Sequence, residues 1–101
     1  MPGKIIRVDI DGTICKTNGV DYINATPILD RIVKINRLYN EGNEIIYWTA
    51  RGALNEKDWT VLTKAQLKRW KCKYTRLDMN KPLFDEFYDD RAFNAAELDN
   101  Q

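Results

Sequence analysis

The amino-acid sequence predicts an α/β fold with a mainly parallel sheet of about four strands. Apolar runs of strand length alternate along the chain with segments whose apolar residues recur at helical spacing. This alternation is typical of layered α/β proteins, in which helices cover a parallel sheet. Polar and charged side chains directly follow several of the strands, which is where ligands bind in such sheets. We expect the 101 residues, 1–101, to form a single domain.

Composition is that of an ordinary globular protein. The hydrophobic share of 44%, the charged share of 31% and the net charge of +1 give no general attraction to nucleic acid or membranes. Neither a membrane-spanning run nor the apolar core of a signal peptide is expected. Cys15 and Cys72 fit no metal-binding spacing and are interpreted as free thiols of a reducing cytosol, so we expect a cytoplasmic protein. The sequence has no histidine, which excludes Ser-His and Cys-His catalysis.

The first predicted strand begins at Ile5 and leads into two acidic residues, Asp9 and Asp11. Side chains two residues apart share one side of an extended chain, so both carboxylates are expected to face one point past the strand. Gly12 then allows a sharp turn. Two carboxylates that close together repel each other unless a cation or a proton compensates. The alternative interpretation is a solvated Asp-Gly turn after an ordinary strand.

The rest of the chain alternates helices and strands. Asn18-Gly19 predicts either a small hairpin or an irregular loop. Thr26 and Pro27 are predicted as the N-cap and first residue of a helix that ends at Gly42. The other predicted elements are a strand at 44–49, a polar loop at 53–58, a helix at about 59–70, strands at 74–77 and 86–88, and a helical turn around 94–98.

Several polar residues are expected at the carboxyl edge of this sheet, since parallel strands end on the same side. They are Asp9, Asp11, Thr49, Arg51, Asp89 and Asp90.

Four motifs in this order resemble the haloacid dehalogenase (HAD) superfamily of phosphotransferases. Residues 9–13, Asp-Ile-Asp-Gly-Thr, match its first motif, DxDGT. Thr49, Lys81 and the pair Asp89-Asp90 match the second, third and fourth motifs, so the resemblance covers nearly the whole chain. It implies a three-layer Rossmann-like core and a Mg²⁺-dependent phosphatase that hydrolyses a phosphomonoester.

A narrower resemblance is to small phosphatase-like proteins found near capsule and surface-sugar genes and in phages. It rests on residues 47–52, on Lys81-Pro82 and on residues 88–90. The stretches 13–26 and 49–81 are too short for the cap domain that many superfamily members contain. We therefore expect a member without a cap and with an open site.

The resemblance implies a role for each matching residue. Asp9 would be the nucleophile that forms an aspartyl-phosphate, and Asp11 would protonate the leaving oxygen and then deprotonate the attacking water. Mg²⁺ would be held by Asp9, by the main-chain carbonyl of Asp11, and by Asp89 or Asp90. The substrate phosphate would be bound by residues near the ends of the strands, namely Gly12, Thr49, Ala50, Arg51 and Lys81. For Arg51, a structural ion pair is an equally weighted alternative.

Two other functions are retained. A polynucleotide 3′- or 5′-end phosphatase would need a basic, aromatic groove. The residues available for such a groove are Arg51, Lys57, Trp59, Lys64, Lys68, Arg69 and Trp70, and a solvated helix face is the alternative. The other function is a non-catalytic binding module that keeps the fold. The expected partner is a phosphorylated substrate, either a sugar phosphate or a larger glycan or nucleic-acid end, with no membrane partner. A homo-oligomer whose interface shields the site is an alternative to a large substrate.

Overall fold

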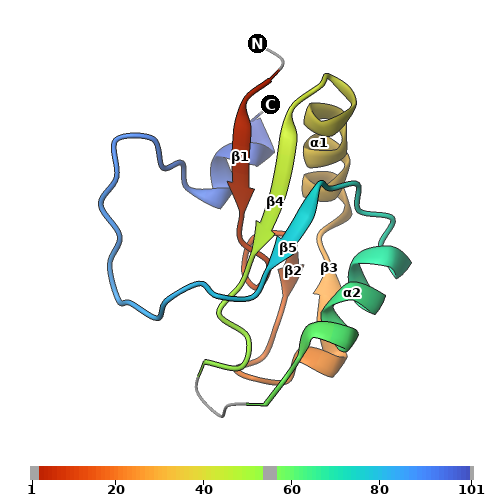
Figure 1. Ribbon diagram of the computed structural model, residues 1–101, viewed down its shortest axis with the longest axis vertical. Coiled ribbons are helices and arrows are strands. Elements are labelled where there is room, and N and C mark those ends of the chain that lie inside the picture. The colour runs from red at the N-terminus through yellow and green to blue at the C-terminus, as the bar shows by residue number, and fades with distance from the viewer. Residues whose placement is uncertain (1–2, 54–56, 101) are drawn as a thin grey trace.

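A parallel sheet organises the computed structural model of the protein, which describes residues 3–53 and 57–100. Strands β1 (Ile5–Val8), β4 (Glu44–Trp48) and β5 (Arg76–Asp78) pair in parallel in the order β1-β4-β5. All three run towards the same edge of the sheet, the lower edge in Figure 1. The predicted α/β class with parallel strands is therefore confirmed.

Strand β4 lies at the centre of the core. Its residues Ile45, Ile46 and Tyr47 are at most 2% exposed, because β1 and β5 flank it and helix α1 (Leu29–Asn40) packs against it. Helix α2 (Thr60–Arg69) connects β4 to β5. Burial of this apolar surface is the main stabilising contribution to such a small domain. The buried apolar cluster comprises Val8, Ile10, Ile14, Cys15, Ala25, Ile32, Ile35, Ile45, Tyr47, Leu67 and Trp70.

A two-stranded antiparallel sheet follows β1. Its strands are β2 (Cys15–Lys16) and β3 (Thr26–Pro27), and the connection between them contains the 3₁₀ turn η1 (Tyr22–Asn24). The small hairpin predicted at Asn18-Gly19 is therefore wrong: a 3₁₀ turn follows Gly19, and the strand that pairs with β2 is Thr26–Pro27. Pairing with β2 also explains why Thr26 is not the N-cap of α1. That helix begins two residues after Pro27, with Ile28 at its N-cap.

The predicted strand at 86–88 is wrong. Residues 79–94 contain no helix or strand, and Figure 1 shows them as a wide loop beyond β1. Phe87 stacks on Phe84 at 5.2 Å between ring centroids, while Phe87 and Tyr88 remain 51% and 89% exposed. The apolar run therefore pairs its own rings instead of entering the core. The described sheet has three strands, whereas about four were predicted.

The chain then returns to α1. The predicted helical turn around 94–98 is confirmed as the 3₁₀ helix η2 (Ala95–Asn100). Arg31 in α1 pairs with Asp99 in η2 through its Nε at 2.9 Å and also donates to the carbonyl oxygen of Thr13 at 3.2 Å. This arginine therefore links the C-terminal turn to the loop after β1.

The other boundaries agree with the sequence predictions within one or two residues. Gly42 follows α1 with a φ of 100°, which suits the predicted glycine stop. Within the predicted polar loop at 53–58, residues 54–56 lie outside the described residues. Among the described helices, none has the length and apolar character needed to cross a membrane.

Candidate active site

Asp9 lies at the carboxyl edge of the sheet, directly after β1. Its side chain is 34% exposed, and its Oδ1 pairs with the Nζ of Lys81 at 3.2 Å. Lys81 is attached to the end of β4, because its backbone N–H donates to the carbonyl oxygen of Thr49 at 3.2 Å. The Lys81 ammonium also lies 5.6 Å from the ring centre of Trp48. The predicted meeting of Asp9, Thr49 and Lys81 at one edge is therefore observed.

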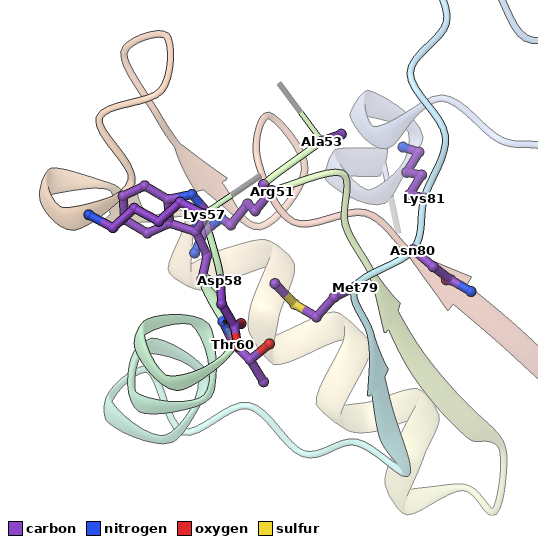
Figure 2. A pocket seen from close by; sticks show the side chains of 10 residues that line it. Arg51, Ala53, Lys57, Asp58, Thr60, Met79, Asn80 and Lys81 are labelled. Atoms are coloured by element: carbon purple, nitrogen blue, oxygen red, sulfur yellow. Dashed lines mark hydrogen bonds between the residues drawn. The ribbon is translucent and has the colours of Figure 1, made fainter. Parts of the chain in front are cut away.

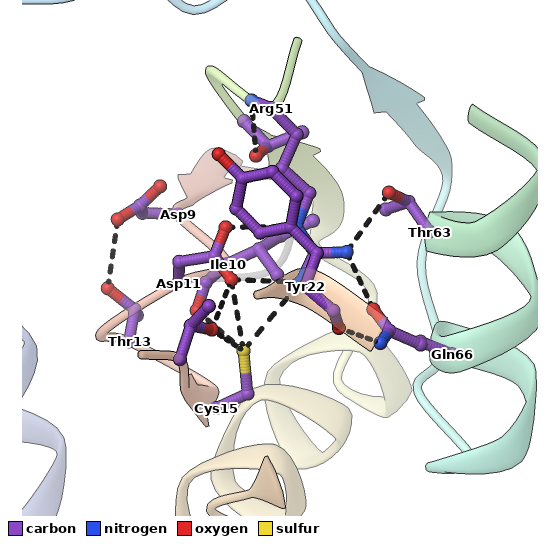
Figure 3. Close-up of polar contacts among 11 residues, drawn as sticks. Asp9, Ile10, Asp11, Thr13, Cys15, Tyr22, Arg51, Thr63 and Gln66 are labelled. Atoms are coloured by element: carbon purple, nitrogen blue, oxygen red, sulfur yellow. Dashed lines mark hydrogen bonds and ion pairs between the residues drawn. The ribbon is translucent and has the colours of Figure 1, made fainter. Parts of the chain in front are cut away.

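Asp11, two residues later, has a different cation. Its two carboxylate oxygens accept hydrogen bonds from the Nε and Nη2 of Arg51 at 2.9 and 2.8 Å, and Oδ1 also accepts one from Thr17 at 2.5 Å (Figure 3). Burial alone would raise the pKa of the Asp11 carboxyl. The hydrogen bonds from Arg51 and Thr17 and the Arg51 charge outweigh that effect, so the pKa lies below its usual value. Each carboxylate of the first motif is thus compensated by its own cation.

Cys15 lies beneath Asp11 and is fully buried. Its Sγ is 3.5 Å from Oδ1 of Asp11 and 3.5 Å from Oγ1 of Thr17. Burial is the main cause that raises the pKa of this thiol to about 11. A thiol with such a high pKa is a poor nucleophile at neutral pH, so Cys15 has a packing role here.

The residues predicted to bind the substrate phosphate are not equally available. The Lys81 side chain is 18% exposed, whereas the Thr49 side chain is buried and its Oγ1 accepts a hydrogen bond from the Arg51 backbone N–H at 3.2 Å. The N–H of Gly12 already donates to the Cys15 carbonyl at 2.8 Å. In this conformation Lys81 is the best placed of the predicted phosphate ligands.

The predicted metal ligands do not come together. Asp89 and Asp90 lie exposed in the loop 79–94. Within the ranges 3–53 and 57–100 there is no group of three or more acidic or cysteine side chains that could hold a metal ion. The resemblance implies Mg²⁺, but as arranged here these residues do not supply its full ligand set.

A cavity of about 380 Å³ opens beside Lys81, between the loop after β4 and the loop after β5 (Figure 2). Gly52 adopts a φ of +94° in its wall, and a Cβ there would lie 2.5 Å from the carbonyl oxygen of Lys57. Only glycine therefore fits this turn without moving the wall. The lining comprises Arg51, Gly52, Ala53, Lys57, Asp58, Trp59, Thr60, Met79, Asn80 and Lys81.

Sequence reasoning missed several polar partners of the site. Thr17 and Tyr22 lie in the connection between β2 and β3, and Thr63 and Gln66 project from α2 towards Arg51 (Figure 3). Thr63 and Gln66 are each 1% exposed and are three residues apart, which puts them on one helix face. The sequence did contain a signal for these two partners of Arg51: they are polar residues at helical spacing, on a face that also contains Leu67.

The chain resembles one solved structure along almost its entire length. A crystal structure of a structural-genomics target from Vibrio cholerae aligns with a TM-score of 0.81 and 31% sequence identity. The match covers 97% of this chain and 89% of that chain. No family model matches the sequence, and no curated protein matches it. By identity and coverage, this chain belongs to the same family as the Vibrio cholerae protein.

Proposed function

We propose that this protein is a HAD-type phosphatase that hydrolyses a phosphomonoester through an aspartyl-phosphate on Asp9. The observation that supports this most is the Asp9–Lys81 pair, an accessible carboxylate with an ammonium 3.2 Å away at the carboxyl edge of a parallel sheet. A carboxylate can attack phosphorus, and the ammonium neutralises part of the phosphate charge. The cavity beside Lys81 offers room for the organic part of the substrate.

The proposed reaction has two displacements. An Asp9 oxygen attacks phosphorus, the ester P–O bond breaks, and the leaving oxygen takes a proton from the Asp11 carboxyl. Water then attacks the phosphoryl group, its proton passes to the Asp11 carboxylate, and the bond between Asp9 and phosphorus breaks to release phosphate. The hydrogen bonds of Asp11 to Arg51 favour its ionised form, which accepts the water proton in the second step. The first step uses the less populated protonated form, which the second step regenerates.

A panel assay tests this proposal. Phosphate release is measured with sugar phosphates, nucleotides and oligonucleotides phosphorylated at the 3′ or 5′ end, in the presence of Mg²⁺. We expect at least one class to be turned over, with the better rates on larger substrates, because no cap closes over a small molecule. The mass in solution is measured alongside, since an oligomer could shield the site. Absence of phosphate release from every substrate would contradict the proposal and favour a binding module.

A polynucleotide-end phosphatase is the second candidate. Lys57 and Trp59 support it, because both line the cavity next to Lys81. Trp70 does not, since it is 7% exposed and packs in the core. The oligonucleotide arm of the panel separates this candidate from a sugar phosphatase. A cytoplasmic location remains part of the proposal, and the free thiols of Cys15 and Cys72 support it.

Metal dependence is a separate prediction. Asp9 and Asp11 each take up one cation, Lys81 and Arg51, so these four groups leave no surplus positive charge for a phosphate dianion without a further cation. We expect EDTA to reduce activity to background and excess Mg²⁺ to restore it. The double variant Asp89→Asn/Asp90→Asn tests whether the loop 79–94 supplies metal ligands when Mg²⁺ binds: a higher Mg²⁺ concentration for half-maximal activity than in the exposed control Asp30→Asn would show that it does. Full activity in the chelator would remove the metal from the proposal.

A further inference from the structure

The Arg51 guanidinium is the most enclosed charged group that contacts the candidate site. The residue is 4% exposed and its side chain is fully buried. A guanidinium has five N–H donors. Those of Nε and Nη2 face Asp11 and the Sγ of Cys15, while Nη1 donates to Thr63 at 3.1 Å and to Gln66 at 2.6 Å. All five donors therefore have a partner inside the protein, and none is directed at solvent.

Three elements surround this guanidinium. Asp11 follows β1, Gln66 belongs to α2, and the ring of Tyr22 in η1 lies 4.8 Å from the Arg51 Cζ. Gln66 also donates through its Nε2 to the main-chain carbonyl of Tyr22 at 2.6 Å. The guanidinium is thus held by a closed network, which fixes its position relative to both the sheet and α2.

The consequence for Asp11 is a fixed orientation. Two parallel hydrogen bonds from one planar group set both the position and the plane of a carboxylate. Asp9 has no such clamp: it faces a flexible lysine at 3.2 Å and a weak hydrogen bond from Thr13 at 3.4 Å. The Asp9 carboxylate is therefore accessible for attack, and the Asp11 carboxylate is held in a single geometry by Arg51.

We infer that Arg51 is a positioning residue, which aims the Asp11 carboxyl at the substrate oxygen and does not bind phosphate itself. The inference rests on the proposed function and assigns to Arg51 the structural ion pair instead of a phosphate contact. Loss of this orientation should slow proton transfer and leave phosphate affinity unchanged. Substrates with poor leaving groups should suffer most, because they depend on a proton from Asp11.

The test compares Arg51→Lys with Lys81→Ala in steady-state kinetics. The substrates are an aryl phosphate with a good leaving group and an alkyl phosphate with a poor one, and inorganic phosphate serves as the competitive inhibitor. For Arg51→Lys we expect kcat on the alkyl ester to fall about a hundredfold, a smaller loss on the aryl ester, and a Ki for phosphate within about twofold of wild type. Lys81→Ala should instead raise that Ki.

Because changing a buried cation can unfold the protein, Thr63→Val provides a milder variant. It keeps Arg51 and removes one of its five acceptors. We therefore expect kcat on the alkyl ester again to fall more than kcat on the aryl ester, by about tenfold instead of about a hundredfold. Two results for Arg51→Lys or Thr63→Val would overturn the positioning role of Arg51 and leave the proposed function standing. They are an equal loss of kcat on both esters, and a Ki for phosphate raised more than about tenfold. A wild-type protein inactive on both esters and on the substrate panel overturns the proposed function, and this assignment with it.

Discussion

Replacing Asp9 with Asn should lower turnover by at least about 10⁴-fold, since an amide cannot form the acyl-phosphate on which the proposed mechanism depends. The fold should be preserved, because the side chain is one-third exposed and the lost partner is a single lysine. An ion pair in such a setting contributes about 0–1 kcal/mol to stability. This variant should therefore lose its turnover while its midpoint of thermal unfolding stays close to that of wild type.

The matched control is Asp30→Asn, which neutralises an exposed acid in the first turn of α1. It changes the net charge by the same amount and should leave turnover unaffected. Incubation with substrate followed by acid quench and mass measurement should find a phosphoryl adduct on wild type and none on the Asp9→Asn variant. Activity of that variant within about tenfold of wild type would refute the nucleophile assignment.

Removing the Asp11 side chain should lower the free energy of unfolding strongly, unlike the Asp9→Asn change, which should leave it almost unchanged. The Asp11→Ala change leaves the buried guanidinium of Arg51 without its counter-ion. An uncompensated buried charge costs about 3–5 kcal/mol, and the 25% exposure of the Asp11 side chain argues for the lower end. Urea unfolding measures this as a lower midpoint at unchanged slope. Asp9→Ala is the control, and a loss as large as that of Asp11→Ala would contradict the buried-pair argument.

The same pair determines a pH dependence. Since the pKa of the Asp11 carboxyl is lower in the folded protein than its ordinary value of 3.8, the pair stabilises the fold fully above that value. The contribution is lost as the pH falls below 3.8 towards the folded pKa. In unfolding measurements from pH 6 down to pH 2.5, wild type should lose more stability than Arg51→Met. If the free energies of unfolding of the two proteins fell in parallel with pH, the stabilising Asp11–Arg51 pair would be contradicted.

The sequence predicted those parts of the fold that depend on local pattern. Residues 44–49 are almost continuously apolar, so a buried strand was the only good interpretation, and β4 lies there. The apolar run Phe87-Tyr88 looked similar, but a strand also needs a partner, and pairing with a distant strand cannot be read from a short run. Thr26 has the chemistry of an N-cap, yet the antiparallel pairing of β3 with β2 prevailed over that local preference.

For the site, the sequence located the residues better than it located their contacts. Asp9, Thr49 and Lys81 meet as expected, because parallel strands end at one edge. Arg51 was expected near that edge, but its burial depends on Thr63 and Gln66, which come from a helix that packs there only in three dimensions. Two equally plausible roles for one arginine can be separated only when its neighbours are known.

Strand β1 pairs with β4 on one side, and among the described residues no strand covers its other side. Such an edge offers a row of unpaired peptide groups to any extended chain that approaches it. Ile5, at the start of the strand, is 68% exposed, and only Arg7 adds a charge to β1. Concentrated samples should therefore self-associate through strand addition at this edge. Replacing Ile5 with Lys should make the protein easier to keep dispersed, because charged edge residues discourage such pairing.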